Sequence, residues 1–228
     1  DTGKELLQKN MDVHPGSPGA AVTYIQLLGY MADWDGMIQV CNESYGRFPG
    51  ETGFLEMRNA AYYNKKDYRM VLEGCRQMIA AAPSDTSVTI PALSNMGDMY
   101  HELGDAKNAF KCYKSVLRLN PDYIPVLNNY AYFLSLEGKS LKKAEQMSRK
   151  TIEKEPDNPT YLDTYAWILH MLGRDADAKP HFKHAMLYGG KDSSVMLEHY
   201  SIVLDALGES DLAKVYRNLA QEKKKEGK

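Results

Sequence analysis

Five prolines recur at a nearly constant interval along this chain. Pro15, Pro49, Pro83, Pro121 and Pro156 lie 34, 34, 38 and 35 residues apart. Each proline follows a stretch with helical periodicity, and a proline ends a helix because it lacks an amide hydrogen and its ring clashes with the preceding turn. A fixed period of this length is typical of repeat proteins, so the internal repeat constrains the fold more than any local feature does.

Residues 90–123 give the clearest repeat, because their apolar residues form two stripes with helical spacing. The stripes are Leu93, Met96 and Tyr100, and then Ala109, Tyr113 and Val116. Between them, we expect Gly104 to end the first helix with a positive φ and Asp105 to cap the second. Two helices with such faces cannot bury them alone, so the repeats must stack on one another.

The signature residues of this repeat resemble the tetratricopeptide pattern W-x₂-L-G-x₂-Y…A-x₃-F…P. They are Leu93, Met96, Gly97, Tyr100, Ala109, Tyr113, Val116 and Pro121. The same register fits residues 18–51, 52–85, 124–158 with one inserted residue, 159–192, and 194 onward. Residues 1–17 fit the second helix of a truncated leading repeat, which implies a longer parent protein.

The resemblance implies an all-α fold, a right-handed superhelical solenoid of antiparallel helix pairs. Residues 18–228 are expected to form about six repeats in one continuous solenoid. The fifth repeat departs from the pattern at Pro180, which lies inside its second helix, so we expect a kink or a late helix start there.

Composition excludes several classes of function. The net charge is −2, from 28 Lys and Arg against 30 Asp and Glu, and this balance gives no field that attracts nucleic acid. No apolar run is long enough to span a membrane. The cysteines Cys41, Cys75 and Cys112 are odd in number and lack CxxC spacing, so we interpret them as small buried hydrophobic residues without zinc or disulfides.

No catalytic motif is present, whether GxGxxG, P-loop, HExxH or nucleophile elbow, so the sequence predicts no enzyme, no catalytic residue, no cofactor and no metal site. Three stretches, including 126–135 and 161–174, resemble repeats of bacterial tetratricopeptide proteins, many of them attached to the cell envelope. The sequence does not decide between cytoplasm and periplasm.

The family resemblance also implies that the first helix of each repeat lines a concave surface. The exposed positions of these helices are 2, 5, 6, 9, 12 and 13, counted from the first residue of each repeat. Of the 36 such residues in six repeats, none is Lys or Arg and six are Asp or Glu. We therefore expect an acidic groove that favours a basic partner, without the basic clamp of the chaperone-binding members. Three histidines, His101, His170 and His199, also occupy such positions.

Ten of these residues form the predicted partner-binding site, because amides, carboxylates and a Trp together are typical of interface anchors. They are Asn95, Asp98, Asn128, Asn129, Tyr132, Asp163, Thr164, Trp167, His170 and Glu198. An alternative for Trp167 and Tyr132 is that they pack between neighbouring first helices.

The sequence thus predicts a scaffold that binds a protein or peptide, without nucleic acid as a partner and without membrane insertion by this segment. The alternative is a spacer or self-association arm of a larger protein, attached to the cell envelope in one version. A homo-oligomer is compatible with both.

Overall fold

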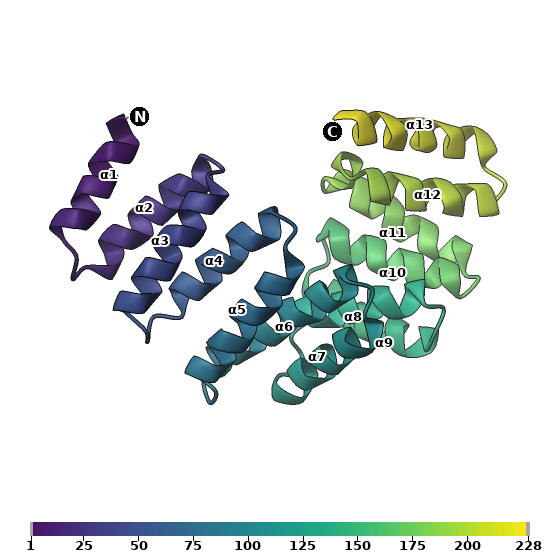
Figure 1. Cartoon of the computed structure of the whole chain (residues 1–228). Helices are drawn as coiled ribbons and strands as arrows, with labels where there is room; N and C mark the ends of the chain where they lie inside the picture. The colour runs from purple at the N-terminus through teal and green to yellow at the C-terminus, as the bar shows by residue number, and fades with distance from the viewer. Residues whose placement is uncertain (1, 227–228) are drawn as a thin grey trace. The chain divides into compact units, whose positions relative to one another are not determined.

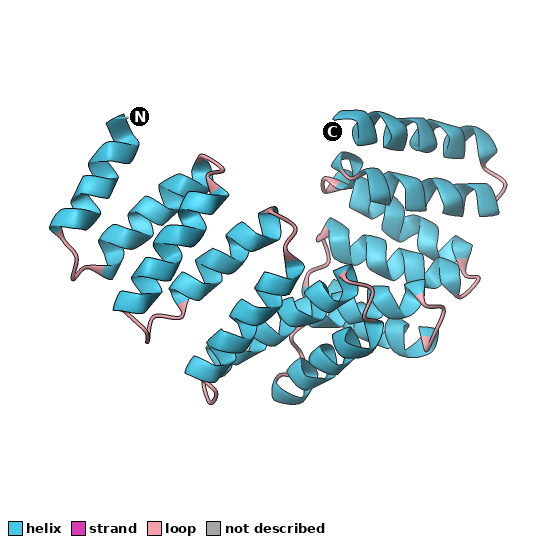
Figure 2. Cartoon of the chain, viewed as in Figure 1, coloured by secondary structure: helices cyan, strands magenta, loops and turns pink. Residues whose placement is uncertain are grey.

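The computed structural model describes residues 2–226, and the chain divides into two compact units, Asp1–Pro121 and Asp122–Lys228. Every regular element among the described residues is helical (Figures 1 and 2). Asp1, Gly227 and Lys228, at the two limits of the predicted repeat array, lie outside the described residues. None of the described helices is long and apolar enough to cross a membrane.

The N-terminal unit is built from seven helices. They are α1 (Thr2–Val13), α2 (Pro18–Tyr30), α3 (Trp34–Arg47), α4 (Gly53–Asn64), α5 (Tyr68–Ala81), α6 (Thr86–Glu102) and α7 (Ala106–Leu119). The C-terminal unit holds six α-helices and one 3₁₀ turn. They are α8 (Ile124–Leu136), α9 (Leu141–Lys154), α10 (Pro159–Met171), α11 (Asp175–Leu187), η1 (Gly190–Asp192), α12 (Ser194–Ala206) and α13 (Ser210–Glu226).

Consecutive helices pack against each other within each unit. In the N-terminal unit α2, α4 and α6 pair with α3, α5 and α7, and α3 and α5 also pack on the helix that follows them. In the C-terminal unit α8, α10 and α12 pair with α9, α11 and α13 in the same way. The predicted all-α fold of antiparallel helix pairs is therefore confirmed. The expectation of one continuous solenoid over residues 18–228 stays a prediction.

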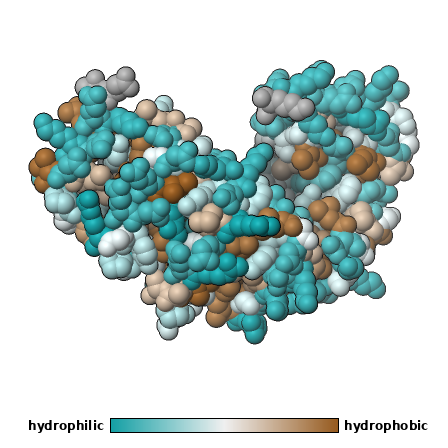
Figure 3. Space-filling view, in the orientation of Figure 1, coloured by the Kyte–Doolittle hydropathy of each residue, from teal (hydrophilic) through white to brown (hydrophobic). Residues whose placement is uncertain are grey.

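The apolar stripes read from the sequence form the cores of both units. Leu55 and Val116 in the N-terminal unit, and Phe182 and Leu204 in the C-terminal unit, are fully buried. All three cysteines are free and buried, as predicted, and burial raises the pKa of the Cys41 and Cys75 thiols to about 12. The view in Figure 3 shows a mainly hydrophilic surface with separate hydrophobic spots.

Helices α6 and α7 cross closely at Gly97. A Cβ atom built on Gly97 would lie 2.3 Å from Cε1 of Tyr113, and the Tyr113 side chain is fully buried. The Tyr113 hydroxyl donates a hydrogen bond of 2.5 Å to the Asp98 carboxylate on the same side of α6. Gly97 therefore allows the tyrosine ring of α7 to lie directly against the backbone of α6.

The turns inside the six helix pairs share one backbone conformation. In all six pairs the residue at register position 15 has a positive φ, and Gly104, with φ of 76°, confirms the sequence expectation. The other residues are Gly138, Gly173 and Gly208, and in the first two pairs Ala32 (φ 54°) and Lys66 (φ 58°). In five pairs the following residue directly precedes the second helix, and in the α8–α9 pair one further residue, Ser140, lies between them. Asp105 caps α7 as predicted by accepting from the amide of Asn108 at 3.1 Å.

Two prolines lie inside helices, at Pro91 in α6 and at Pro180 in α11. The interval of 38 residues before Pro121 contains one additional helical turn, since α6 begins at Thr86 with Asp85 as its cap, and Pro91 lies inside the helix. A late start caused by Pro180 is wrong. Helix α11 begins at Asp175, the register position at which the other second helices begin, and Pro180 is accommodated inside it.

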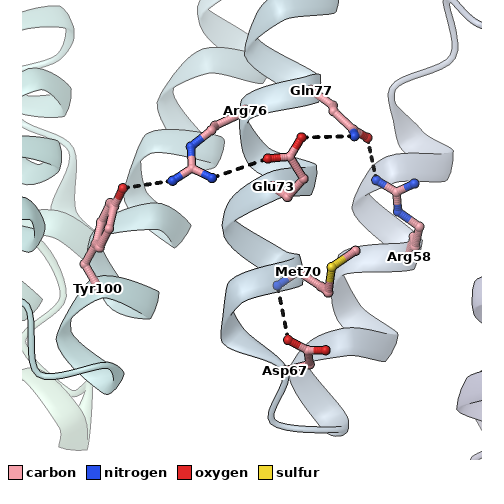
Figure 4. Close-up of polar contacts among 7 residues, drawn as sticks. All are labelled: Arg58, Asp67, Met70, Glu73, Arg76, Gln77 and Tyr100. Atoms are coloured by element: carbon pink, nitrogen blue, oxygen red, sulfur yellow. Dashed lines mark hydrogen bonds and ion pairs between the residues drawn. The ribbon is translucent and has the colours of Figure 1, made fainter.

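A buried arginine links three helices of the N-terminal unit, and Figure 4 shows its contact with Gln77 of α5. Arg58 of α4 is 9% exposed and donates to the Oδ1 of Asn42 on α3 at 2.7 Å and to the Oε1 of Gln77 on α5 at 2.6 Å. Nearby, Arg76 donates to the Tyr100 hydroxyl of α6 at 3.1 Å. A charge-assisted hydrogen bond of this kind is stronger than a neutral one, so Arg58 ties the first two repeats together.

The turn geometry predicts opposite effects for a matched pair of substitutions. Gly104→Ala forces an alanine to a positive φ and should lower the free energy of unfolding by about 1 kcal/mol. Ala32→Gly relieves the same conformation and should raise it by about 0.5 kcal/mol. The control is Gly46→Ala in α3, where an added Cβ meets no atom within 4 Å, and it should stabilise the helix. Urea unfolding midpoints measure the stability of all three variants. A shift of the midpoint in the same direction for Gly104→Ala and Gly46→Ala would contradict this explanation.

The buried arginine gives a second stability prediction. Arg58→Ala removes two charge-assisted hydrogen bonds and should lower the free energy of unfolding by about 2–3 kcal/mol. Arg76→Ala is the control, because the Arg76 side chain is 50% exposed and should contribute less than about 1 kcal/mol. Both values come from urea titration followed by circular dichroism, and equal losses would show that Arg58 has no special role.

Candidate functional site

The predicted site residues divide between the two units. Asn95 and Asp98 lie on α6 in the N-terminal unit, where Asn95 is exposed. The other eight lie on the first helices of the C-terminal unit. They are Asn128, Asn129 and Tyr132 on α8, Asp163, Thr164, Trp167 and His170 on α10, and Glu198 on α12. The C-terminal unit therefore contains most of the predicted site.

Trp167 lies between two imidazole rings. Its ring stacks on His199 of α12 with centroids 4.1 Å apart and an interplanar angle of 19°. On the same helix, His170 lies 5.0 Å from it at 39°. His170 is itself held by the Asp175 carboxylate, with Nδ1 2.5 Å from Oδ1. The indole of Trp167 is therefore fixed by aromatic contacts on two sides.

Asp163 and His199 form a buried pair that joins α10 to α12. Asp163 is 6% exposed and His199 is 8% exposed, and the imidazole Nδ1 lies 3.0 and 3.2 Å from the two carboxylate oxygens. Two oxygens of one carboxylate within hydrogen-bonding distance of Nδ1 match a contact in which the imidazole nitrogen donates, because a carboxylate oxygen is an acceptor. Burial raises the pKa of the Tyr132 hydroxyl, and the negative charge of Asp163 raises it further.

Two of the predicted polar contact residues near this pair are buried in the structure. Asn128 is 4% exposed and Thr164 is 3% exposed. The amide of Asn128 donates to the Oδ1 of Asn129 at 3.2 Å, whereas its own buried oxygen has no hydrogen-bond partner among the described residues. The buried Nε1 of Trp167 also lacks one. A buried donor or acceptor without a partner costs about 1–3 kcal/mol, so this polar cluster is incompletely satisfied.

The acidic residues of the C-terminal first helices are all paired within the chain. Asp163 is bonded to His199, Glu198 to Lys224 at 2.5 Å, and Asp205 to Arg217. Lys224 and Arg217 both come from α13, a second helix. The negative charge expected from the residue count is therefore partly neutralised in this unit, although no first-helix position there is basic.

A cationic hollow lies elsewhere, in the N-terminal unit. It measures about 470 Å³ between α6 and α7, and its lining consists of Leu93, Lys111, Cys112, Lys114, Ser115 and Arg118. None of its three cationic side chains forms an ion pair within the part of the chain that the structure describes. This surface favours acidic groups, in contrast to the first-helix positions.

Sequence reasoning missed His199 and Asp175 as site residues. The register contained the signal for His199, which occupies position 6 of the sixth repeat, while Asp163 occupies position 5 of the fifth repeat. Such positions of successive first helices face each other in stacked repeats. Asp175 begins α11, and no first-helix pattern points to it. Within the described residues no group of three or more His, Cys, Asp or Glu side chains can hold a metal ion.

The sequence of the chain is similar to part of one curated protein. An uncharacterized protein ycf37 from Pyropia yezoensis is 39% identical over 69 residues, which is 30% of this chain and 38% of that protein. The match thus spans well under two thirds of the relative. No family model matches the chain.

Solved structures match a much larger share of the chain. A tetratricopeptide repeat protein from Parabacteroides merdae superposes with a TM-score of 0.73, covering 96% of this chain and 84% of that one at 15% identity. YrrB, described as a tetratricopeptide repeat protein with an unusual peptide-binding site, gives a TM-score of 0.58 over 81% of this chain and 93% of its own at 12% identity. The fold of this chain is therefore tetratricopeptide-like, as the residue pattern predicted.

The buried pair leads to a prediction about coupling. A double-mutant cycle of Asp163→Ala and His199→Ala should give a coupling free energy of about 1–3 kcal/mol, because the two groups form a buried hydrogen bond to a charge. The control cycle uses Glu198 and Lys224, whose side chains are 48% and 51% exposed and should couple by less than about 1 kcal/mol. Urea unfolding of the six variants and the parent supplies both values. Similar coupling in the two cycles would show that burial does not strengthen the Asp163–His199 pair.

Proposed function

We propose that this chain is a non-catalytic scaffold that binds a protein or peptide segment on the first helices of its C-terminal unit, with Trp167 at the centre. The observation that carries the proposal is the fixed, half-buried Trp167 ring beside exposed apolar side chains of the same helices. The described residues contain no metal-binding cluster, and the sequence contains no catalytic motif. Neither feature is therefore available as an argument for a reaction at this surface.

The exposed apolar groups are arranged along α8 and α10. Leu136 is 49% exposed and Met171 is 36% exposed, and both occupy register position 13 of their repeats. Tyr132 and Trp167, at position 9, are half-buried. An aromatic centre flanked by exposed aliphatic side chains is the composition expected of a contact surface.

The rigidity of Trp167 also supports binding. The stacking on His199 means that Trp167 packs between α10 and α12, so the packing role considered from the sequence is part of its function. A side chain already fixed loses little conformational entropy when a partner covers it, and rigid aromatic residues are common interface hot spots. Packing and binding are therefore compatible roles for the same ring.

The class of function has support from a structural relative. YrrB shares the fold, and its structure is described as containing a peptide-binding site. We extend to this chain only the general role, the binding of a peptide or protein, because identity at 12% shows the fold alone.

The basic character of the partner rests on charge. The first helices of the C-terminal unit carry no Lys or Arg, but a basic partner must compete there with Lys224 and Arg217 for the acidic groups. We propose a partner segment with an apolar anchor and flanking basic residues. The apolar anchor supplies most of the affinity in this arrangement, and the charges add selectivity.

The proposal is tested by selecting a displayed random-peptide library on the whole chain. Peptides that bind should lose at least tenfold in affinity with Trp167→Ala and with Met171→Glu, because both remove the apolar contact surface. Tyr30→Ser is the control, since Tyr30 is 92% exposed on a first helix of the N-terminal unit. Circular dichroism confirms that each variant is folded.

The dependence of peptide affinity on salt concentration distinguishes the apolar anchor from the basic flanks. Affinity that falls by severalfold between 50 and 500 mM NaCl supports the basic flanks, because exposed charge pairs are screened. If the affinity does not depend on salt, the apolar anchor of the partner segment is supported and its basic flanks are ruled out. Selected peptides that bind Met171→Glu and Trp167→Ala as tightly as the parent would overturn the site.

A further inference from the structure

Helix α7 carries a row of positive charges and no negative charge. Lys107, Lys111, Lys114 and Arg118 are all exposed, and Ala106–Leu119 contains neither Asp nor Glu. Their spacing of four, three and four residues places them along one side of the helix, where like charges destabilise it. None of the four side chains forms an ion pair within the part of the chain that the structure describes.

The acidic residues on either side of α7 have other partners. Asp105, before the helix, accepts from the backbone amide of Asn108 at 3.1 Å and from its side chain at 2.6 Å. These hydrogen bonds lower the pKa of Asp105 most, and the first two lysines of the row lower it further. Asp122, after the helix, pairs with Lys150 at 2.8 Å. Direct contacts with these two carboxylates therefore do not neutralise the row.

Comparison with the other second helices shows that the fold does not require this row. The row occupies register positions 18, 22, 25 and 29, and at these positions each of the other five helices has at most two cations. Two occur in α5 and in α9, and there the arginine at position 25 pairs with a glutamate of its own helix. The pairs are Arg76 with Glu73 and Arg149 with Glu145. Only α7 has the cations without the acids.

The same face of α7 borders a hollow that is apolar as well as cationic. The hollow of about 470 Å³ is lined by Leu93, Lys111, Cys112, Lys114, Ser115 and Arg118. Leu93 occupies register position 4 and is half-buried, whereas the residue at this position is buried in the five other repeats. Position 26 is Ser115 in α7 and a larger residue in every other second helix. The small serine leaves space beside Leu93.

Arg118 is oriented at this hollow. Its guanidinium donates to the Oγ of Ser115 at 2.9 Å. A guanidinium has five donors in a fixed planar arrangement, so one bond to Ser115 leaves donors for a carboxylate, which it can bind through two parallel hydrogen bonds. The hollow thus offers apolar surface from Leu93 together with a positioned carboxylate-binding group.

We propose that this face of α7 binds an acidic peptide segment of a partner protein, with an apolar side chain in the hollow beside Leu93 and carboxylates on the row from Lys107 to Arg118. The apolar contact distinguishes such a segment from a phosphate backbone, and the net charge of −2 gives no long-range attraction for nucleic acid. The surface lies in the N-terminal unit, so the inference does not depend on the proposed function of the Trp167 site.

Fluorescence anisotropy of the whole chain tests this binding with a labelled peptide in which two glutamates flank a central leucine on each side. Replacing the glutamates by glutamines should weaken the affinity about tenfold, because it removes the charges that the row recognises. Replacing the leucine by glycine should weaken it severalfold, because it removes the apolar contact in the hollow.

Variants of α7 locate the site. Lys114→Glu should weaken peptide binding about tenfold. Lys183→Glu makes the same charge change at position 25 of α11 and should leave binding unchanged. Ser115→Gln introduces the residue that α5 has at position 26, and it should weaken binding severalfold by filling the hollow at constant charge. Lys114→Glu should also raise the urea midpoint, since it places a glutamate four residues before Arg118, so its loss of binding cannot come from unfolding.

Several results would overturn the proposal. They are no peptide binding at about 1 mM, equal binding of the glutamine peptide, equal effects of Lys114→Glu and Lys183→Glu, or full binding by Ser115→Gln. Tighter binding of a single-stranded oligonucleotide or of phosphatidylserine vesicles, lost with Lys114→Glu, would assign the row to another class of partner. A dimer of the chain that Lys114→Glu dissociates would assign it to a second copy.

Discussion

Each helix pair in this chain has an apolar face that its own partner helix cannot cover, and the structure depends on the burial of that face by the next pair. The contact is close because small residues lie where helices cross. Gly97, for example, leaves space that the fully buried Tyr113 ring fills. Register position 24 is buried in five second helices whether it is Cys, Tyr, Ser or Phe. Burial there follows from stacking geometry, while the type of side chain adapts to the space available.

The repeat made much of this fold predictable. The proline interval, the turn at Gly104 and the cap at Asp105 depend on local chemistry, so they could be derived from the sequence. The errors arose where two local signals compete. The repeat register, counted from residue 90, did not indicate that α6 begins earlier, at Thr86, with Asp85 as its cap. Pro180 carries the general penalty of a proline in a helix, yet α11 is continuous through it, with Ala178 and Phe182 buried in the core on either side.

The candidate site was predictable in position but less so in chemistry. The register placed Trp167 and Asp163 on the first helices correctly. It did not indicate that Asp163 is buried against His199, or that Glu198 and Asp205 have cationic partners on α13. Those contacts join residues that are 12 to 36 positions apart in the sequence, and their formation depends on rotamers and on the spacing between helices. Counting charges on one face therefore did not reveal the groups that pair with them from another helix.

Comparison of equivalent positions within one chain separates residues that the fold requires from residues that it only permits. Six repeats satisfy the same packing rules, so a residue type shared by most of them is explained by stacking. Three features fall outside those rules: the buried Arg58, the Trp167 ring between two histidines, and the row of cations on the exposed face of α7. Arg58 has two hydrogen-bond acceptors inside the chain, which account for it structurally. The exposed edge of Trp167 and the row from Lys107 to Arg118 have no such internal explanation. They are therefore the positions at which a second molecule best completes the structure.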